Sequence, residues 1–177
     1  MDSLAEQLLS ACESGDISTV RKYVESGVSP SIVWDFPSRA YKHGNSALMW
    51  ATRFGHLSIV QYLLDRHADT THARPYFGDV LHTAAFHNQS AIGQYLIANG
   101  HDIETRTKPC ERTPLHVACG QLSFDFAKMI IQAGGHISAV DDAGCTPLDL
   151  ASLYADRTLF NFIEQSGGVA GSLKRSH

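Results

Sequence analysis

The sequence predicts an all-α fold, a solenoid of stacked helix-turn-helix units with projecting finger loops. The segment TPLHVACG at residues 113–120 returns as TPLDLASL at residues 146–153, 33 residues later. Each copy begins with residues that start a helix. A second segment with apolar residues at helical spacing follows each copy. Repetition with a period of roughly 20 to 50 residues is typical of solenoids, in which each unit packs against its neighbours.

The same unit occurs five times. Copies start near residues 6, 46, 79, 113 and 146, with the sequences EQLLSACE, SALMWATR, DVLHTAAF, TPLHVACG and TPLDLASL. In the last two copies Thr serves as N-cap, and Pro occupies the first helical position, which needs no amide donor. Ser46 and Asp79 offer equivalent caps. Leu115 and Ala118, with their counterparts in the other units, place one face of this first helix in the core.

The second helix of each unit carries an apolar stripe, and in four units a glycine follows it, as a left-handed cap residue would: Gly27, Gly100, Gly134 and Gly167. Leu122 and Ala155 stand where the other units have Gly or Asn between their helices, so those two turns are expected to differ. Glu25 and Glu164 give the terminal units a polar outer face. We therefore expect a complete array over residues 1–168 and a disordered tail over residues 169–177.

This pattern resembles the ankyrin repeat from residue 4 to about residue 168. The motifs that carry the resemblance are TPLH, the repeated alanines, RFGHLSIVQYLLDRHAD at 53–69 and DDAGCTPLD at 141–149. The resemblance implies that inner helices and finger loops line a concave surface. It also implies that His82 and His116 hydrogen-bond to the backbone of a neighbouring repeat. The alternative is that these two histidines ligate a metal together with Cys119.

The composition bounds the class of protein. The chain has 177 residues, of which 44% are apolar, and a net charge of -4, so it is expected to be one soluble, monomeric domain that does not bind nucleic acid. Its N-terminus lacks the basic region of a signal peptide, and no segment is apolar enough to enter a membrane. Its four cysteines form no CxxC pair, which suits a reducing compartment. We expect a cytoplasmic or nuclear protein.

No catalytic pattern is present in the sequence. It contains no HExxH, GxxxxGK[ST] or GxSxG motif. Asp141 and Asp142 are interpreted as a solvated turn, and Cys110 as a loop thiol with no base beside it. The prediction is that the protein is not an enzyme and uses no cofactor or metal.

Binding is expected at exposed positions of the inner helices and fingers of the second and third repeats. Aromatic and basic residues, the types enriched in interface hot spots, gather there. The predicted site comprises Trp50, Arg53, Phe54, Phe86 and His87 from the helices, and Trp34, Arg39, Tyr41, Lys42, Arg74, Tyr76, Phe77, Arg106 and Lys108 from the fingers. Asp141 and Asp142 reverse the sign of this basic rim at its far end. The alternative for the first finger is that Trp34, Phe36 and Tyr41 pack on one another.

The sequence thus predicts a non-catalytic protein–protein interaction module that binds a partner in the groove of repeats two and three. The partner is expected to be a protein or peptide with apolar anchors and acidic flanks. Two alternatives remain open. The chain could be a substrate-recruiting or targeting subunit of a larger complex, or a secreted microbial effector.

Overall fold

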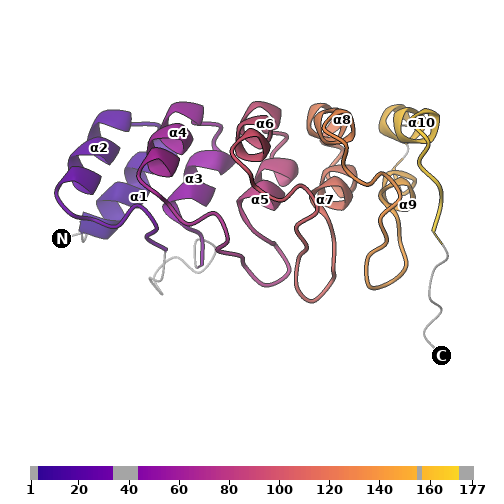
Figure 1. The fold of residues 1–177 in the computed structure, drawn as a ribbon, viewed down its shortest axis with the longest axis horizontal. Helices are drawn as coiled ribbons and strands as arrows, with labels where there is room; N and C mark the ends of the chain where they lie inside the picture. Colours follow the sequence, from indigo (N-terminus) through magenta and orange to yellow (C-terminus); the bar gives the residue numbers. More distant parts are fainter. Residues whose placement is uncertain (1–3, 34–43, 155–156, 172–177) are drawn as a thin grey trace. The chain divides into compact units, whose positions relative to one another are not determined.

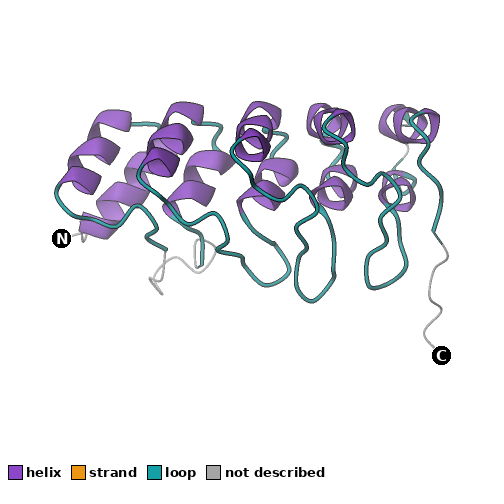
Figure 2. Ribbon diagram, in the orientation of Figure 1, coloured by secondary structure: helices purple, strands orange, loops and turns teal. Residues whose placement is uncertain are grey.

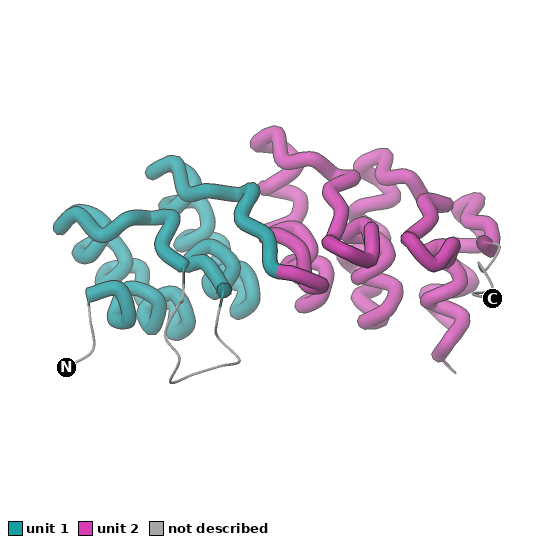
Figure 3. The backbone as a smooth tube through the Cα atoms, turned by 90° about the horizontal axis from the view of Figure 1, so that it is seen from below, with its two compact units in different colours: residues 1–74 teal, residues 75–177 magenta. Residues whose placement is uncertain are grey.

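The structure, a computed structural model, describes residues 4–33, 44–154 and 157–171. The chain divides into two compact units, unit 1 with residues 1–74 and unit 2 with residues 75–177 (Figure 3). Unit 1 contains α1 (Leu4–Ser14), α2 (Ile17–Glu25), α3 (Ala47–Arg53) and α4 (Leu57–Asp65). Unit 2 contains α5 (Val80–Phe86), α6 (Ser90–Ala98), α7 (Pro114–Gly120), α8 (Phe124–Gln132), α9 (Pro147–Ala151) and α10 (Thr158–Gln165).

Within unit 2 the helices form two layers (Figure 1). Helices α5, α7 and α9 lie side by side in one row, and α6, α8 and α10 form the second row. Long finger loops project on the side of the first row. We call α1, α3, α5, α7 and α9 the inner helices and the others the outer helices. Turns and loops join the helices, and the described residues contain no extended strand (Figure 2), so the predicted all-α solenoid is confirmed.

The inner helices begin at the predicted caps. The Ser46 hydroxyl accepts a hydrogen bond from the Met49 amide at 3.1 Å. Thr113 and Thr146 form capping boxes with His116 and Asp149, and a proline follows each threonine. These contacts satisfy amide groups that the first helical turn leaves without an intrahelical partner. Because the contacts are local, the sequence alone was sufficient to place the helix starts.

Close packing between outer helices depends on one glycine. Gly93 of α6 is buried, and a Cβ atom placed on it would lie 2.5 Å from Phe126 Cε2 and 2.7 Å from Met129 Cε, both in α8. The absence of a side chain therefore lets α6 and α8 approach each other. Phe126 itself is fully buried.

The turn at Leu122 was predicted to differ from its counterparts, but it has the same backbone conformation. Leu122 has φ 55°, close to the 53° of Asn88 at the equivalent turn. A leucine therefore adopts the left-handed conformation that Gly or Asn adopts more readily. Tertiary packing of the repeat holds this turn and overrides the local preference. Ala155, the other departure, lies outside the described residues.

The finger loops of unit 2 are tied to the helices by buried polar side chains. His82 Nε2 lies 2.9 Å from the Arg112 carbonyl oxygen, and His116 Nε2 lies 3.0 Å from that of Cys145. The predicted structural role of these two histidines is confirmed. Beyond α10, the Gly171 amide donates to Asp149 at 2.8 Å. Residues 169–171 of the expected tail thus run beside the last repeat, and residues 172–177 lie outside the described residues.

Candidate functional site

Three predicted site residues of unit 1, Trp50, Arg53 and Phe54, lie together at the end of α3. The Phe54 ring stacks on Trp50 with a centroid distance of 5.7 Å and on His56 at 6.3 Å. The Arg53 guanidinium lies 5.2 Å from the centre of the Trp50 ring and 5.6 Å from that of Phe54. Arg53 and Phe54 are exposed. They present a cation and an aromatic ring side by side.

The prediction that Trp50 belongs to the exposed surface is wrong. Its side chain is only 2% exposed. Repeat spacing placed Trp50 at a position that Thr83 and Val117 occupy in other repeats, where those smaller side chains are partly exposed. The larger indole is buried, and Phe54 and Arg53 pack against its ring. Trp50 is therefore a core residue that supports the exposed pair.

A second arginine adds charge to this part of unit 1. Arg74 Nη1 donates a 3.0 Å hydrogen bond to the side-chain oxygen of Asn45. Burial, and then the positive charge of Arg53, lower the pKa of Arg74 below its usual range. Two guanidinium groups therefore lie within electrostatic range of each other, an arrangement that an acidic group on a partner would stabilise.

Part of the predicted site cannot be placed. Trp34, Arg39, Tyr41 and Lys42 lie outside the described residues. The alternative that Trp34, Phe36 and Tyr41 pack on one another lies there too.

In unit 2 the predicted aromatic residues are exposed. Tyr76 and Phe77, in the loop before α5, are 67% and 56% exposed, and Phe86 at the end of α5 is 42% exposed. The rings of Phe86 and His87 lie 5.0 Å apart. These residues agree with the expectation that inner helices and fingers carry the available aromatic surface.

The predicted basic residues of the unit 2 rim both contact groups of the finger loops. Lys108 forms an ion pair with Glu111. Arg106 donates to the carbonyl oxygens of Glu111 and Val140 at 2.8 and 2.9 Å. Both cations thus contact finger-loop groups, and the Glu111 carboxylate offsets the charge of Lys108, whereas Arg106 keeps its full charge.

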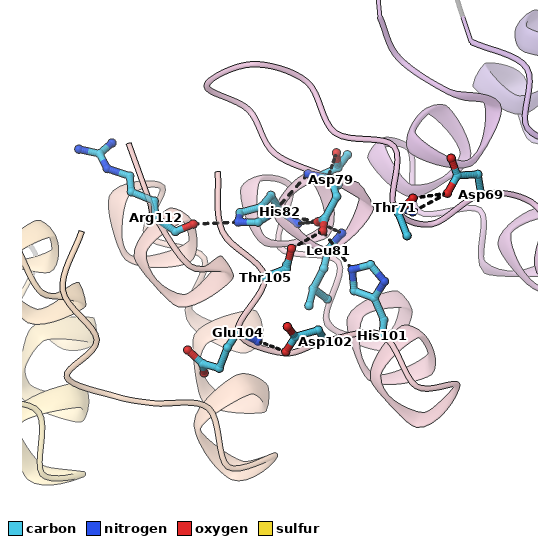
Figure 4. A network of polar contacts seen from close by, with 11 residues as sticks. Asp69, Thr71, Asp79, Leu81, His82, His101, Asp102, Glu104, Thr105 and Arg112 are labelled. Atoms are coloured by element: carbon cyan, nitrogen blue, oxygen red, sulfur yellow. Dashed lines mark hydrogen bonds and ion pairs between the residues drawn. The ribbon is translucent and has the colours of Figure 1, made fainter. Parts of the chain in front are cut away.

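The most extensive polar network of unit 2 surrounds the Asp79 carboxylate (Figure 4). Its Oδ1 lies 2.8 Å from His82 Nδ1, and its Oδ2 accepts from Thr105 Oγ1 at 2.7 Å and lies 3.2 Å from His101 Nε2. Burial by itself would raise the pKa of Asp79, but hydrogen bonds from His101, His82 and Thr105 and the charge of His82 lower it well below its usual range. The sequence analysis missed His101. The sequence feature that could have pointed to this network is Asp79, which stands at the cap position where two other repeats have threonine.

This network is structural. Asp79 is 4% exposed, and both of its oxygens are occupied. Among the described residues, no group of three or more His, Cys, Asp or Glu side chains has the arrangement of a metal site. Burial raises the pKa of the Cys12 thiol to about 12 and also raises that of Cys119, so neither behaves as an activated nucleophile.

Exposed large apolar side chains have an uneven distribution. In the described part of the chain they belong to inner helices, to the residues just after these helices, to finger loops, or to the segment after α10. None lies on an outer helix within those described ranges. The residues are Leu4, Phe54, Tyr76, Phe77, Phe86, Val140, Leu153, Tyr154 and Val169.

Comparison with known families agrees with this architecture. A family model described as ankyrin repeats in three copies matches residues 81–167, and one described as ankyrin repeats in many copies matches residues 8–64. The chain belongs to the ankyrin-repeat family. Ankyrin repeats are generally protein–protein interaction modules, and the family is typically non-catalytic.

Similar proteins carry ankyrin repeats within much longer chains. The chain is 31% identical over 104 residues to human ankyrin repeat and KH domain-containing protein 1, covering 58% of this chain and 4% of that protein. It is 30% identical over 143 residues to a Caenorhabditis elegans homologue of transient receptor potential cation channel subfamily A member 1, covering 80% and 11%. It is 26% identical over 133 residues to the zebrafish (Danio rerio) putative palmitoyltransferase ZDHHC13, covering 73% and 21%. The ankyrin chain thus spans a small part of each relative.

No helix within the described ranges of this ankyrin chain combines the length and the apolar character that a membrane span requires.

Proposed function

We propose that this ankyrin chain is a non-catalytic module that captures a partner protein on its inner helices and finger loops. The observation that carries the proposal is the confinement of exposed large apolar side chains to that side of the repeats and to the segment after α10. Contiguous exposed apolar residues are typical of interaction surfaces. The outer helices lack such residues within the described ranges, so they are the less favourable face for a partner.

The chemistry of unit 1 supports a partner with an apolar anchor and an acidic flank. Phe54 offers an exposed ring with the Arg53 guanidinium 5.6 Å from its centre, and the charges of Arg53 and Arg74 act on each other. Aromatic and arginine side chains contribute strongly to binding when a partner covers them. An aspartate or glutamate of the partner would relieve the repulsion between the two guanidinium groups.

The sequence predicts a concave binding groove formed by repeats two and three and their fingers. Phe54 belongs to unit 1 and Phe86 to unit 2. The groove stays a prediction, and the proposal is made for the inner surface of each unit.

A second candidate function is a targeting subunit or segment that recruits substrates for a larger assembly. The relatives favour it, because the chain matches at most 21% of the length of the three compared above. In this case binding would use the same inner surface, and the output would reside in another domain or polypeptide.

The test compares inner and outer surface variants in affinity capture with quantitative mass spectrometry. Phe54→Ala/Arg53→Glu alters unit 1, and Phe86→Ala/Tyr76→Ala alters unit 2. The matched control is Lys128→Glu, which lines a groove of about 310 Å³ between the outer helices α6 and α8. Circular dichroism and thermal melting must show that all variants remain folded.

Partners retained by the wild type and the outer variant but lost from an inner variant support the proposal. Partners retained by both inner variants and lost from Lys128→Glu contradict it. A Trp50 variant would not test this surface, because the side chain is buried and its replacement would destabilise the core.

A further inference from the structure

The N-cap of α5 is an aspartate, whereas the N-caps of α7 and α9 are threonines. In α5 and α7 the histidine three positions later lies beside the cap, His82 beside Asp79 and His116 beside Thr113. The two histidines have equivalent positions but different hydrogen-bond partners. These partners determine how many protons each ring carries.

Both ring nitrogens of His82 face oxygen atoms. Nε2 lies 2.9 Å from the Arg112 carbonyl oxygen, and Nδ1 lies 2.8 Å from Asp79 Oδ1 (Figure 4). A neutral imidazole has one N–H group, so one of its nitrogens would face an oxygen lone pair with no proton between them. Nδ1 also lies 3.3 Å from the Asp79 amide nitrogen, but a ring that accepted this longer contact would make the shorter one repulsive. A ring with a proton on each nitrogen satisfies both oxygens.

The Asp79 carboxylate is surrounded by donors that favour its charged form. Oδ1 accepts from the Leu81 and His82 amides at 2.9 and 3.2 Å, and Oδ2 accepts from Thr105 Oγ1 at 2.7 Å. His101 Nε2 lies 3.2 Å from Oδ2, a contact that a neutral ring can make. Burial by itself raises the pKa of Asp79, but the hydrogen bonds from His101, His82 and Thr105 lower it well below its usual range. The proton between Oδ1 and Nδ1 therefore belongs to the ring.

His116 has a hydroxyl where His82 has the carboxylate. Its Nε2 lies 3.0 Å from the Cys145 carbonyl oxygen, and its Nδ1 lies 2.8 Å from Thr113 Oγ1. A hydroxyl can donate to an unprotonated nitrogen, so one proton on Nε2 is sufficient. Burial lowers the pKa of His116, which agrees with a neutral ring. The change of cap residue therefore separates the two histidines.

Other charged groups near the α5 cap are directed elsewhere. Arg112 presents its backbone carbonyl to the ring, while its Nε forms an ion pair with Asp141 at 3.2 Å. In the loop after α6, Asp102 accepts from the Glu104 amide at 2.9 Å, and the Glu104 carboxylate accepts from the His136 amide at 2.7 Å. The cap carboxylate is thus the group that balances a positive charge on the ring.

We infer that His82 carries a proton on both ring nitrogens at neutral pH, and that the Asp79–His82 pair is a pH-sensitive clasp between the start of α5 and the finger before α7. The ring donates to the cap through Nδ1 and to the finger through Nε2. Loss of the Nδ1 proton at higher pH leaves two acceptors 2.8 Å apart in a buried site, which is costly. The repeat is then less stable than at lower pH. This inference does not depend on the protein-binding function proposed above.

The first test is nuclear magnetic resonance of the ring nitrogens in the isotope-labelled full chain. Long-range proton–nitrogen spectra distinguish an imidazolium from each neutral tautomer, and His82→Gln and His116→Gln assign the two rings. At about pH 7 we expect an imidazolium at His82 and a neutral ring with its proton on Nε2 at His116. A neutral His82 ring in the wild type would overturn the proposal.

The second test exchanges the two caps. Asp79→Thr should give His82 the neutral ring of His116, and Thr113→Asp should convert His116 to an imidazolium. Thr113→Asp and the wild-type spectrum keep the inference testable if Asp79→Thr does not fold. A His82 ring that remains an imidazolium in Asp79→Thr, or a His116 ring that remains neutral in Thr113→Asp, would contradict the cap as the cause.

The third test is urea denaturation, which measures the consequence for stability. A ring that is more protonated in the folded than in the unfolded chain contributes stability that is full below about pH 6.5 and is lost as the pH rises. The wild type should therefore lose its advantage over Asp79→Thr between about pH 6.5 and 9, by up to about tenfold in the unfolding equilibrium constant per pH unit, because unfolding releases one proton. His116 is present in both chains, so its titration does not account for the difference. An advantage that is constant or grows over this range would overturn the proposal.

Discussion

Replacement of Gly93 by alanine tests how closely α6 and α8 pack. Helix propensity alone predicts that Gly93→Ala stabilises the protein by about 1 kcal/mol. The new Cβ, however, would lie 2.5 Å from Phe126 Cε2 and 2.7 Å from Met129 Cε. The methionine is partly exposed and can move, but Phe126 is fully buried. Overpacking a core costs about 1–3 kcal/mol, so we expect a net loss of about 1 kcal/mol.

The assay is thermal and urea denaturation followed by circular dichroism. A loss of about 1 kcal/mol should lower the melting temperature by about 2–4 °C in a chain of this size. Gly120→Ala is the matched control, because its Cβ meets no atom within 4 Å and only the helix propensity changes. It should raise stability by about 0.5–1 kcal/mol. If Gly93→Ala were as stable as Gly120→Ala, the reasoning from the short contacts would be refuted.

Three further changes have predicted outcomes. Asp79→Asn should lower stability at pH 7 by about 2–3 kcal/mol, because charged hydrogen bonds are lost. Since the folded-state pKa of Asp79 is lowered, this difference should shrink in urea titrations as the pH falls below about 4. Burial lowers the pKa of His116, so the stability that it contributes is present above about pH 6.5 and lost as the pH falls. A difference in the free energy of unfolding between wild type and His116→Gln that stays constant from about pH 7.5 to 5.5 would contradict a neutral buried imidazole. Trp50→Ala should cost about 3–5 kcal/mol and Phe54→Ala less than about 1 kcal/mol in thermal denaturation; similar costs would show that Trp50 is not part of the core.

The repeat architecture could be predicted because its signals are local. A Thr-Pro pair starts a helix through contacts with the next few residues, as the capping boxes at Thr113 and Thr146 show. Apolar residues at helical spacing define a buried face without knowledge of what covers it. The resemblance to the ankyrin repeat implied the bridging roles of His82 and His116.

The candidate site was predicted only in part. Phe54 and Phe86 are exposed as expected, but Trp50 is buried. The spacing that makes a position available applies to every side chain, whereas burial depends on the size of the residue and on what packs against it. The charge available to a partner could not be predicted for the same reason. Lys108 is an unpaired cation as far as the sequence shows, but in the structure it forms an ion pair with Glu111.

The sequence by itself determined the fold class and the helix starts, because these depend on residues a few positions apart. Tertiary structure alone decided that His101 binds Asp79, that Arg53 lies near Arg74 and that the space above Gly120 is open. Each of these depends on atoms brought together from distant segments or from neighbouring repeats. Their distances and mutual burial are set by packing, and no local pattern in the sequence encodes them.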